Sequence, residues 1–394
     1  MKAKILIVDD ILQNIQIVGK ILTDTNYNIS YATDGAGALK KTKHIKFDLI
    51  LLDIMMPEMD GYELCKKLKT NDKTKDIPII FVTAKTDAES IIQGFLAGAQ
   101  DFVSKPFQSQ ELLARIKTHL KLKFQSEELK KTVKELSIKN ENINSSIRYA
   151  KTIQSALLPD IETIKNDFRD FFLLYKPRSI VSGDFYWYHK IKDLQIYIIA
   201  DCTGHGVPGA MLSIAGKAFL DQIIKFDFTT QTDEILNKLD RFFSYLMNNA
   251  EFDLTDGMDI SVFSYNPTKK QVQFSSAGHS LLYFKDNQEI SIEGNMFSIG
   301  GYDQSNNTNF TKHTIEISKN SSYKFYMYSD GFADQLGGKK IKRFTTESLH
   351  KLISEHIDKP MQKQKELFNK TLLEWINNYK QIDDITLTGF FLPE

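Results

Sequence analysis

Residues 198–206, Ile-Ile-Ala-Asp-Cys-Thr-Gly-His-Gly, decide how the second half of this chain folds. A β-branched apolar run ends at Asp201, and a glycine-containing turn leads into Val-Pro-Gly-Ala-Met (207–211), which is typical of a helix start. A carboxylate at a strand end, beside backbone that lacks Cβ atoms, suits a hard divalent cation. Because acidic turns are common, a purely structural turn is the alternative for this stretch taken alone.

Three further acidic turns follow the same pattern. Asp184 lies in Ser-Gly-Asp-Phe (182–185), Asp330 lies in Tyr-Ser-Asp-Gly (328–331), and Asp383 opens the last β-type run together with Asp384. Such strand ends can converge at one edge of a sheet sandwich. Several carboxylates at one edge repel each other unless cations lie between them. The pattern therefore predicts a two-metal hydrolytic centre.

These motifs resemble, in order and spacing, those of the SpoIIE-like branch of metal-dependent (PPM, type 2C-like) protein serine/threonine phosphatases. The resemblance covers about residue 160 to the end of the chain and implies an α+β fold with an αββα sandwich. β-type runs dominate this part, with helical patterns near 208–224, 233–248, 346–356 and 362–379. The matching segments are Asp184, residues 200–206, Ser-Ala-Gly-His (276–279), residues 329–331 and Asp-Asp-Ile-Thr (383–386).

The resemblance also implies roles for individual residues. Asp201 would bridge two Mn²⁺ or Mg²⁺ ions, helped by the backbone carbonyl of Cys202. Asp184 would complete one metal site. Asp330 and Asp383 would complete the other. These four carboxylates are the expected catalytic residues, and Asp334 is expected as a ligand of a looser third metal.

Among the other polar residues of this part, Arg178 and His205 each have two interpretations. Arg178 is a candidate phosphate clamp, since arginine suits bidentate oxygen recognition, or a surface arginine. His205 is a candidate for proton transfer or simply a residue at the helix start. His279 is expected to be structural, and Asp256 and Asp259 are expected to be turn acids.

Length and composition set the general class. The chain has 394 residues with 42% hydrophobic content and a formal net charge of zero, which predicts a soluble protein of two globular domains and a connector. Neutral charge argues against a nucleic-acid surface spread over the whole molecule. The sequence shows no bilayer-spanning run and no signal peptide, so a cytoplasmic protein is expected. The two cysteines, Cys65 and Cys202, lie in separate predicted domains, so no disulfide is expected.

The first 122 residues alternate short apolar runs with helical patterns, which predicts an α/β doubly wound domain with a parallel sheet. In such sheets function gathers at the carboxyl ends of the strands. The residues at these ends are Asp9, Asp10, Asp53, Thr83 and Lys105. The three carboxylates predict a Mg²⁺ pocket, and Asp53 is placed to attack a phosphoryl group. Lys105 and Thr83 could contact phosphoryl oxygens; the alternative is a set of acidic loops with a structural lysine.

Residues 53–61, Asp-Ile-Met-Met-Pro-Glu-Met-Asp-Gly, and 105–107, Lys-Pro-Phe, resemble a response-regulator receiver domain. The resemblance implies a five-stranded sheet, Asp53 as phosphoacceptor and a cis peptide bond before the proline. Asp10 would bind Mg²⁺ directly, Asp9 would bind it through water, and the backbone carbonyl of Met55 would complete the protein ligands. Phe102 would be the aromatic switch residue.

Residues 123–158 form the expected connector. No proline or glycine occurs from residue 107 to residue 158, so the last helix of the first domain is predicted to continue. The sequence carries a heptad seam, which predicts a parallel dimeric coiled coil. A helix packed on its own phosphatase domain is the alternative. The seam consists of Leu122, Leu129, Leu136, Ile143 and Ala150, with Ser126, Val133, Asn140, Ile147 and Gln154 four residues after each.

The sequence thus predicts a receiver domain (1–122), a helical linker (123–158) and a SpoIIE-like phosphatase domain (159–394). A histidine kinase or another phosphodonor would phosphorylate Asp53 and so control a phosphatase acting on phosphoserine or phosphothreonine. The family resemblance suggests an anti-sigma-factor antagonist as the substrate. A partner-switching scaffold without hydrolysis is the main alternative. A transcription factor is weaker, because no compact helix-turn-helix follows the receiver.

Overall fold

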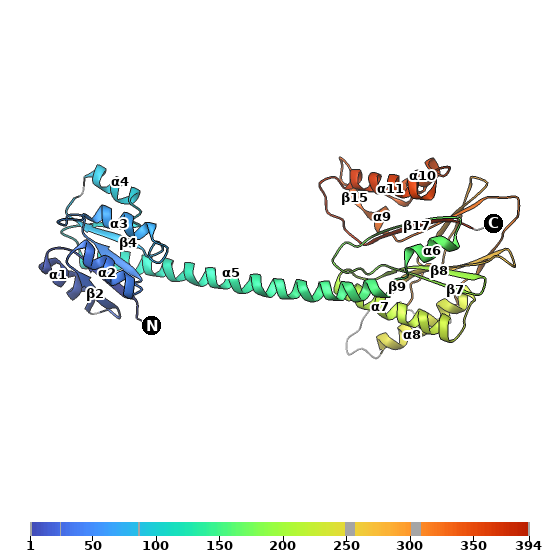
Figure 1. Ribbon diagram of the computed structural model, residues 1–394, viewed down its shortest axis with the longest axis horizontal. Helices are drawn as coiled ribbons and strands as arrows, with labels where there is room; N and C mark the ends of the chain where they lie inside the picture. The colour runs from blue at the N-terminus through green and yellow to red at the C-terminus, as the bar shows by residue number, and fades with distance from the viewer. Residues whose placement is uncertain (1, 24, 86, 249–256, 301–308, 393–394) are drawn as a thin grey trace. The chain divides into compact units, whose positions relative to one another are not determined.

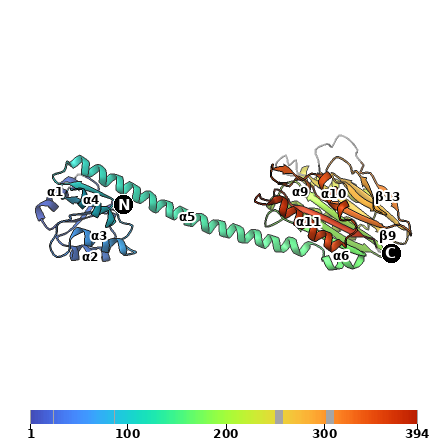
Figure 2. The same cartoon turned by 90° about the horizontal axis from the view of Figure 1, so that it is seen from above.

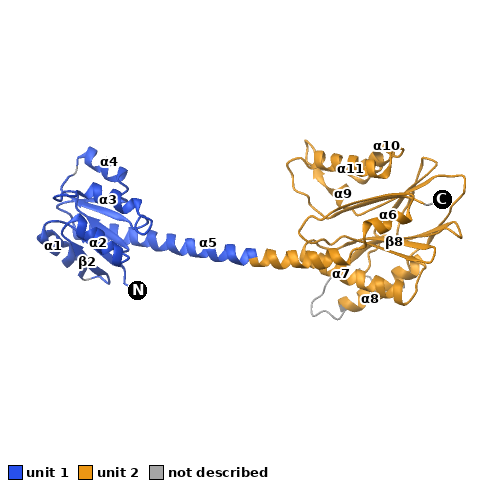
Figure 3. Cartoon of the chain, viewed as in Figure 1, with its two compact units in different colours: residues 1–141 blue, residues 142–394 orange. Residues whose placement is uncertain are grey.

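The computed structural model describes residues 2–23, 25–85, 87–248, 257–300 and 309–392 (Figure 1). Asp256, expected as a turn acid, lies outside these ranges. The chain divides into two compact units, residues 1–141 and 142–394 (Figure 3). Among the helices of the described ranges, none has the length and apolar character needed to cross a membrane.

The first unit is a parallel five-stranded sheet with the order β2-β1-β3-β4-β5. Side chains of α1 and α5 pack on one face of the sheet, and those of α2 and α3 pack on the other. The predicted doubly wound α/β fold is therefore confirmed. The strands are β1 (Lys4–Val8), β2 (Asn28–Ala32), β3 (Leu49–Leu52), β4 (Ile79–Thr83) and β5 (Asp101–Ser104); the helices are α1 (Leu12–Thr23), α2 (Gly35–His44), α3 (Gly61–Thr70), α4 (Ala88–Leu96) and α5 (Ser109–Leu157).

Helix α5 contacts the first unit well beyond the sheet that it covers. The Nζ atom of Lys123, whose residue is only 8% exposed, lies 2.6 Å from Oδ1 of Asp48. About two turns later, Lys130 pairs with Asp76 at 2.9 Å. A buried lysine needs a charged partner, so the Lys123–Asp48 pair fixes this part of the helix against the loop before β3.

The second unit contains two five-stranded sheets, with the orders β13-β10-β9-β8-β7 and β12-β11-β14-β17-β6. An aromatic core that includes Tyr197, Phe263, Phe325 and Phe390 lies between them. Helices α7 and α8 cover the outer face of the first sheet, and α10 and α11 cover the outer face of the second (Figures 1 and 2). This arrangement is the predicted αββα sandwich.

The bounds of these elements place the acidic turns at strand ends, as expected. The strands are β6 (Asp170–Lys176), β7 (Phe185–Ile191), β8 (Leu194–Cys202), β9 (Met258–Asn266), β10 (Gln271–Ala277), β11 (Leu281–Lys285), β12 (Gln288–Ile292), β13 (His313–Glu316), β14 (Tyr323–Tyr328) and β17 (Ile385–Phe391), with a small hairpin of β15 (Leu336–Gly337) and β16 (Lys342–Arg343). The helices are α6 (Ile161–Asp167), α7 (Val207–Leu220), the π-helix η1 (Asp221–Phe226), α8 (Thr232–Asn248), α9 (Gly331–Asp334), α10 (Thr346–Glu355) and α11 (Met361–Ile376).

The connector is helical from Ser109 to Leu157, close to the predicted span of 107–158. Leu129, Leu136 and Ile143 of the expected seam are exposed. Gln154, the last seam position, is instead buried against the second unit of the same chain. The coiled coil stays a prediction, and its seam would end before this residue.

Candidate functional site

The first candidate site lies at the carboxyl ends of the parallel strands. Asp9 follows β1, Asp53 follows β3, and Lys105 follows β5 and is joined to Pro106 by a cis peptide bond. The Nζ atom of Lys105 lies 2.7 Å from Oδ2 of Asp9 and 2.7 Å from Oδ2 of Asp53. Strands that are far apart in sequence thus bring both acids to one lysine, as the topology of the sheet predicts.

This cluster has the chemistry of a divalent cation site. Carboxylate oxygens of Asp9, Asp10 and Asp53 lie within 4.8 Å of one another; Asp9 and Asp53 are buried and Asp10 is exposed. Burial raises the pKa of Asp53, while the bond to Lys105 lowers it. The N–H groups of Ile54 and Met55 also donate to Oδ1 of Asp53, at 2.7 and 3.4 Å. Hard oxygen ligands gathered in this way fit Mg²⁺.

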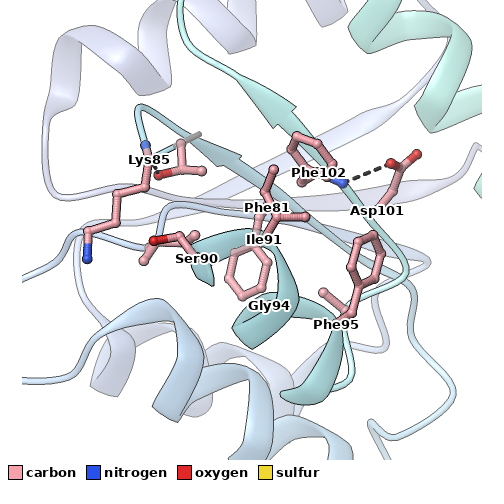
Figure 4. A pocket seen from close by; sticks show the side chains of 11 residues that line it. Phe81, Lys85, Ser90, Ile91, Gly94, Phe95, Asp101 and Phe102 are labelled. Carbon is pink, nitrogen blue, oxygen red and sulfur yellow. Dashed lines mark hydrogen bonds between the residues drawn. The ribbon is translucent and has the colours of Figure 1, made fainter. Parts of the chain in front are cut away.

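Thr83 and Phe102 line a small cavity of about 10 Å³ beside α4 (Figure 4). The Phe102 ring makes an edge contact with Phe95 of α4, with centroids 6.3 Å apart, and its backbone N–H donates to Asp101. Asp101 in turn pairs with Arg115 of α5 at 2.7 Å. The strand that carries the expected switch residue is therefore bonded directly to the first turns of the connector helix.

The second candidate site lies at one edge of the sandwich. Asp184 is fully buried, and its Oδ2 accepts hydrogen bonds from Ser329 (2.8 Å) and Thr386 (2.6 Å), the neighbours of the other acidic turns. Its Oδ1 atom is buried and has no hydrogen-bond partner among the residues that the structure describes. A buried carboxylate oxygen without a partner is costly, which points to a missing cation or water.

The four predicted carboxylates of this site share one electrostatic environment. Burial raises the pKa of Asp201 to about 11, and the charges of Asp184, Asp330 and Asp383 add to this rise. Burial also raises the pKa of Asp184 to about 7. Like charges held together in a buried position are stable as anions only when cations compensate them. The carboxylate donors of this site therefore fit divalent cations in their chemistry.

Close backbone packing holds the loop of Asp184 against the turn that follows Asp201. A Cβ atom on Gly183 would lie 3.0 Å from the carbonyl oxygen of Cys202 and 2.8 Å from that of Gly204. A Cβ atom on Gly209 would lie 2.1 Å from the same Gly204 oxygen. Only glycine permits these approaches, so both glycines serve the geometry of the site.

The two adjacent acids before β17 have different tasks. The Asp384 carboxylate accepts bonds from the backbone N–H groups of Arg178 (2.6 Å) and Gly183 (2.7 Å), so it closes the loop that carries Asp184. Asp383 instead contributes charge to Asp201 and Asp330. The sequence motif alone named Asp383 as the ligand and gave no task to Asp384.

Residues 193–390, half of the chain, match the family model of stage II sporulation protein E (SpoIIE). The chain belongs to the SpoIIE family. Residues 5–117 match the response regulator receiver domain, so a receiver precedes the SpoIIE domain. Both family resemblances drawn from the sequence are thus confirmed.

Known proteins resemble the two parts separately. The SiaA-PP2C domain of Pseudomonas aeruginosa matches with a TM-score of 0.58 and 28% identity, covering 64% of this chain and 98% of that domain. Response regulator PleD of Caulobacter vibrioides is 41% identical over 130 residues, which are 33% of this chain and 29% of PleD. Transcriptional regulatory protein SpaR of Bacillus subtilis is 36% identical over 152 residues, 36% of this chain and 67% of SpaR. The chain therefore spans about a third of the length of PleD.

The remaining predicted residues of the SpoIIE domain are more peripheral. The side chains of Arg178 and His205 are exposed. His279 is only 6% exposed, neither ring nitrogen has a partner within the described ranges, and burial lowers its pKa to about 4. Both carboxylate oxygens of Asp334 lie 3.0 Å from Nη1 of Arg343. Asp334, the expected ligand of a third metal, therefore forms an ion pair with Arg343.

Two residues were not recognised from the sequence as parts of this site: Asp259, which was expected in a turn and lies in β9, and Gln154 of the connector helix. Asp259 stands opposite Asp201 in the antiparallel pairing of β9 with β8, and its charge contributes to the raised pKa of Asp330. Its carboxylate accepts a bond from Ser298. Gln154, at the end of α5, bonds to the loop before Asp184. The sequence signal for Asp259 was an acid at the start of a strand. The signal for Gln154 was a polar residue at a position of the heptad seam.

Proposed function

We propose that this chain is a two-component response regulator in which phosphorylation of Asp53 controls a metal-dependent protein serine/threonine phosphatase. The observation that carries the proposal is that the charges of Asp184, Asp330 and Asp383 act together on Asp201, while one buried oxygen of Asp184 has no partner among the described residues. These observations support an acidic site for cations over a set of separate turns.

Each carboxylate has a distinct task in this proposal. Asp201 would contribute to both cation sites, Asp184 and the Cys202 carbonyl would complete one of them, and Asp330 with Asp383 would complete the other. Bound Mn²⁺ or Mg²⁺ supplies Lewis acidity toward the phosphoryl oxygens and lowers the pKa of a water molecule. Arg178 is the proposed phosphate clamp, because its backbone is bonded to Asp384 beside the Asp184 loop.

In the receiver, Asp53 accepts a phosphoryl group from a histidine kinase or another phosphodonor. Asp10, Asp53 and the Met55 carbonyl would hold Mg²⁺ directly and Asp9 would hold it through water, and the ion would supply positive charge beside the phosphorylated side chain. Lys105, already bonded to Asp53, and the hydroxyl of the buried Thr83 then bind phosphoryl oxygens, and Phe102 responds to the changed position of that hydroxyl.

The proposed substrate is a phosphoserine or phosphothreonine protein, with an anti-sigma-factor antagonist suggested by the family. The similarity to the SiaA-PP2C domain supports the phosphatase over the alternative of a partner-switching scaffold without hydrolysis. The presence of all four principal carboxylates supports it further, since a scaffold has no need of them.

The phosphatase proposal is tested with the full chain and two substrates, a phosphoseryl peptide and p-nitrophenyl phosphate. We expect phosphate release that requires Mn²⁺ or Mg²⁺ and stops when a chelator is added, because the carboxylates alone supply no Lewis acid. Phosphate release at the same rate in excess chelator would contradict the metal-dependent mechanism. Binding of the peptide without any turnover, with either ion, would favour the scaffold.

The proposed link between the two activities runs through Gln154. Its Nε2 donates to the Ser182 carbonyl (2.6 Å) and to the Ser213 hydroxyl (2.8 Å), and its Oε1 accepts from the Ser182 N–H (3.1 Å). Ser182 lies two residues before Asp184, and Ser213 lies on α7, which begins just after the Asp201 turn. Rotation or a shift of α5 would therefore displace two elements that hold metal ligands.

We expect Gln154→Leu to reduce the response of phosphatase activity to acetyl phosphate by at least about fivefold, the lower end of typical coupling. Leucine has a similar size and makes none of the three hydrogen bonds. Gln125→Leu is the matched control, because Gln125 is exposed on the same helix. A full response in the Gln154 variant would show that the signal reaches the site by another route.

The exposed residues Leu129, Leu136 and Ile143 support a parallel dimer through the connector. A single helix has no partner for such a seam within the described part of the first unit. Dimerisation would cover these side chains and would give both copies of α5 a common register.

A further inference from the structure

The hairpin of residues 336–343, Leu-Gly-Gly-Lys-Lys-Ile-Lys-Arg, begins six residues after Asp330. It carries Lys339, Lys340, Lys342 and Arg343, and all four side chains are exposed. The sequence contains no acidic residue from 335 to 346. The hairpin is therefore a concentrated positive surface that follows directly on one of the proposed metal ligands.

A buried polar residue attaches the base of the hairpin to the segment that leads to Asp383. Gln335 is fully buried; its Nε2 donates to the carbonyl of Lys380 (3.1 Å) and its Oε1 accepts from the N–H of Ile382 (3.1 Å). The Trp375 indole donates to the Gln335 carbonyl at 3.0 Å. The hairpin is thus fixed to the two chain segments that carry Asp330 and Asp383.

Arg343 fixes the hairpin from its other end. Its guanidinium contacts both carboxylate oxygens of Asp334, and the Asp334 N–H donates to the carbonyl of Asp330 at 2.9 Å. The charge of Asp334 contributes to the electrostatic environment of Asp330. Arg343 therefore has an internal partner and a structural task beside the acidic site.

The three lysines differ from the exposed lysines of α10 and α11, although other exposed lysines of this domain, such as Lys192 and Lys269, also form no ion pair with the described residues. Lys339, Lys340 and Lys342 form no ion pair with any residue that the structure describes. On α10 and α11, by contrast, exposed lysines pair with acids one turn away: Lys351 with Glu355, Lys363 with Glu366 and Lys370 with Glu374. Like charges held together on a fixed hairpin repel each other, and an anionic partner would relieve that repulsion.

We propose that this hairpin binds an acidic segment of the phosphoprotein substrate that flanks the phosphorylated residue. The inference rests on the proposed phosphatase function and names a feature of its substrate. The hairpin is attached to the two segments that contain Asp330 and Asp383. A substrate polypeptide whose phosphoryl group reaches these acids would therefore pass beside the lysines. Acidic side chains on the substrate would then lie close to the lysines and neutralise their positive charge.

The test compares two phosphoseryl peptides that differ only in their flanking residues, which are aspartate and glutamate in one and asparagine and glutamine in the other. The full chain should prefer the acidic peptide in kcat/KM, mainly through KM. The triple substitution Lys339→Gln, Lys340→Gln and Lys342→Gln should reduce that preference by about five- to tenfold, since each screened surface charge pair contributes little. Turnover of p-nitrophenyl phosphate, which has no flanks, should be unchanged.

The matched control is the triple substitution Lys351→Gln, Lys363→Gln and Lys370→Gln, which removes the same net charge from α10 and α11. It should retain the preference for the acidic peptide. Salt at about 0.5 M should abolish the preference of the unaltered chain, because exposed charges are then screened. Equal loss in both triple variants, or no preference in the unaltered chain, would overturn the docking role.

Direct binding separates this inference from the phosphatase proposal. Fluorescence anisotropy with an unphosphorylated acidic peptide needs no turnover. Binding that weakens in the hairpin variant alone supports the docking role even if the chain hydrolyses neither substrate. Turnover of both peptides at equal rates, with no binding of the acidic peptide, overturns the docking role and leaves the phosphatase proposal intact.

Discussion

Asp201→Asn should reduce phosphate release by at least about a thousandfold, because one shared carboxylate serves both proposed cations and each metal contributes several kcal/mol to the transition state. The substitution keeps the size of the side chain and removes its charge. Because burial and the charges of Asp184, Asp330 and Asp383 raise the pKa of Asp201 to about 11, the metal-free protein holds this side chain protonated near neutral pH, and asparagine replaces a neutral group there. We therefore expect an unfolding temperature in chelator that is equal to that of the unaltered chain.

The control for this variant is Asp193→Asn, the same chemical change at an exposed position in the turn before β8. It should leave both turnover and the stabilisation by Mn²⁺ unchanged. The stabilisation by Mn²⁺ should be lost in the Asp201 variant, measured by thermal unfolding with and without the ion. Normal turnover of Asp201→Asn at limiting Mn²⁺ would rule out a bridging role.

Asp53→Asn should reduce phosphorylation by acetyl phosphate to background, because an amide cannot form the acyl phosphate. The fold should survive, since Lys105 keeps its bond to Asp9. Intact-mass spectrometry after incubation with acetyl phosphate and Mg²⁺ measures the result. Asp72→Asn, at an exposed position of the same domain, should be phosphorylated as the unaltered chain is.

A second measurement follows from the same variant. If phosphorylation controls the phosphatase, acetyl phosphate should no longer change its rate in Asp53→Asn. Phosphate incorporated to the same extent in this variant would mean that another residue is the acceptor. An unchanged rate response without incorporation would mean that acetyl phosphate acts on the second domain directly.

The acidic cluster of the receiver could be predicted from sequence because its geometry depends on a topological rule. In a parallel doubly wound sheet the carboxyl ends of the strands share one edge, whatever the loops do. Asp9, Asp53 and Lys105 therefore had to meet, although they are separated by about fifty residues each. This rule places the three residues together without any information on how side chains pack.

The acidic site of the SpoIIE domain could be predicted only in part. Four acids at strand ends were visible in the sequence, but the neighbour of Asp201 across the sheet was not. Asp259 stands opposite Asp201 only because of the register between β8 and β9, which are separated by α7, η1 and α8. The division of labour between Asp383 and Asp384 depends on where the backbone of Arg178 and Gly183 lies.

Short elements and single polar residues of this chain could not be predicted from the sequence pattern. Helix α6 and strand β13 have seven and four residues, too few for a hydrophobic period to stand out. Gln154 occupied a heptad position and was assigned to a seam between two chains. Its burial comes from hydrogen bonds to Ser182 and Ser213, contacts with distant parts of the chain that a local pattern does not contain.

The buried pair of Lys123 and Asp48 has a consequence for exchanging modules between proteins. A receiver cut at residue 122, where sequence similarity suggests its end, would lose the lysine and leave Asp48 without that partner. Grafting another receiver onto this helix would join a foreign loop to the same lysine. A working chimera would therefore transplant the sheet together with the helix to about residue 141, and its fusion point would lie within the helix rather than at its start.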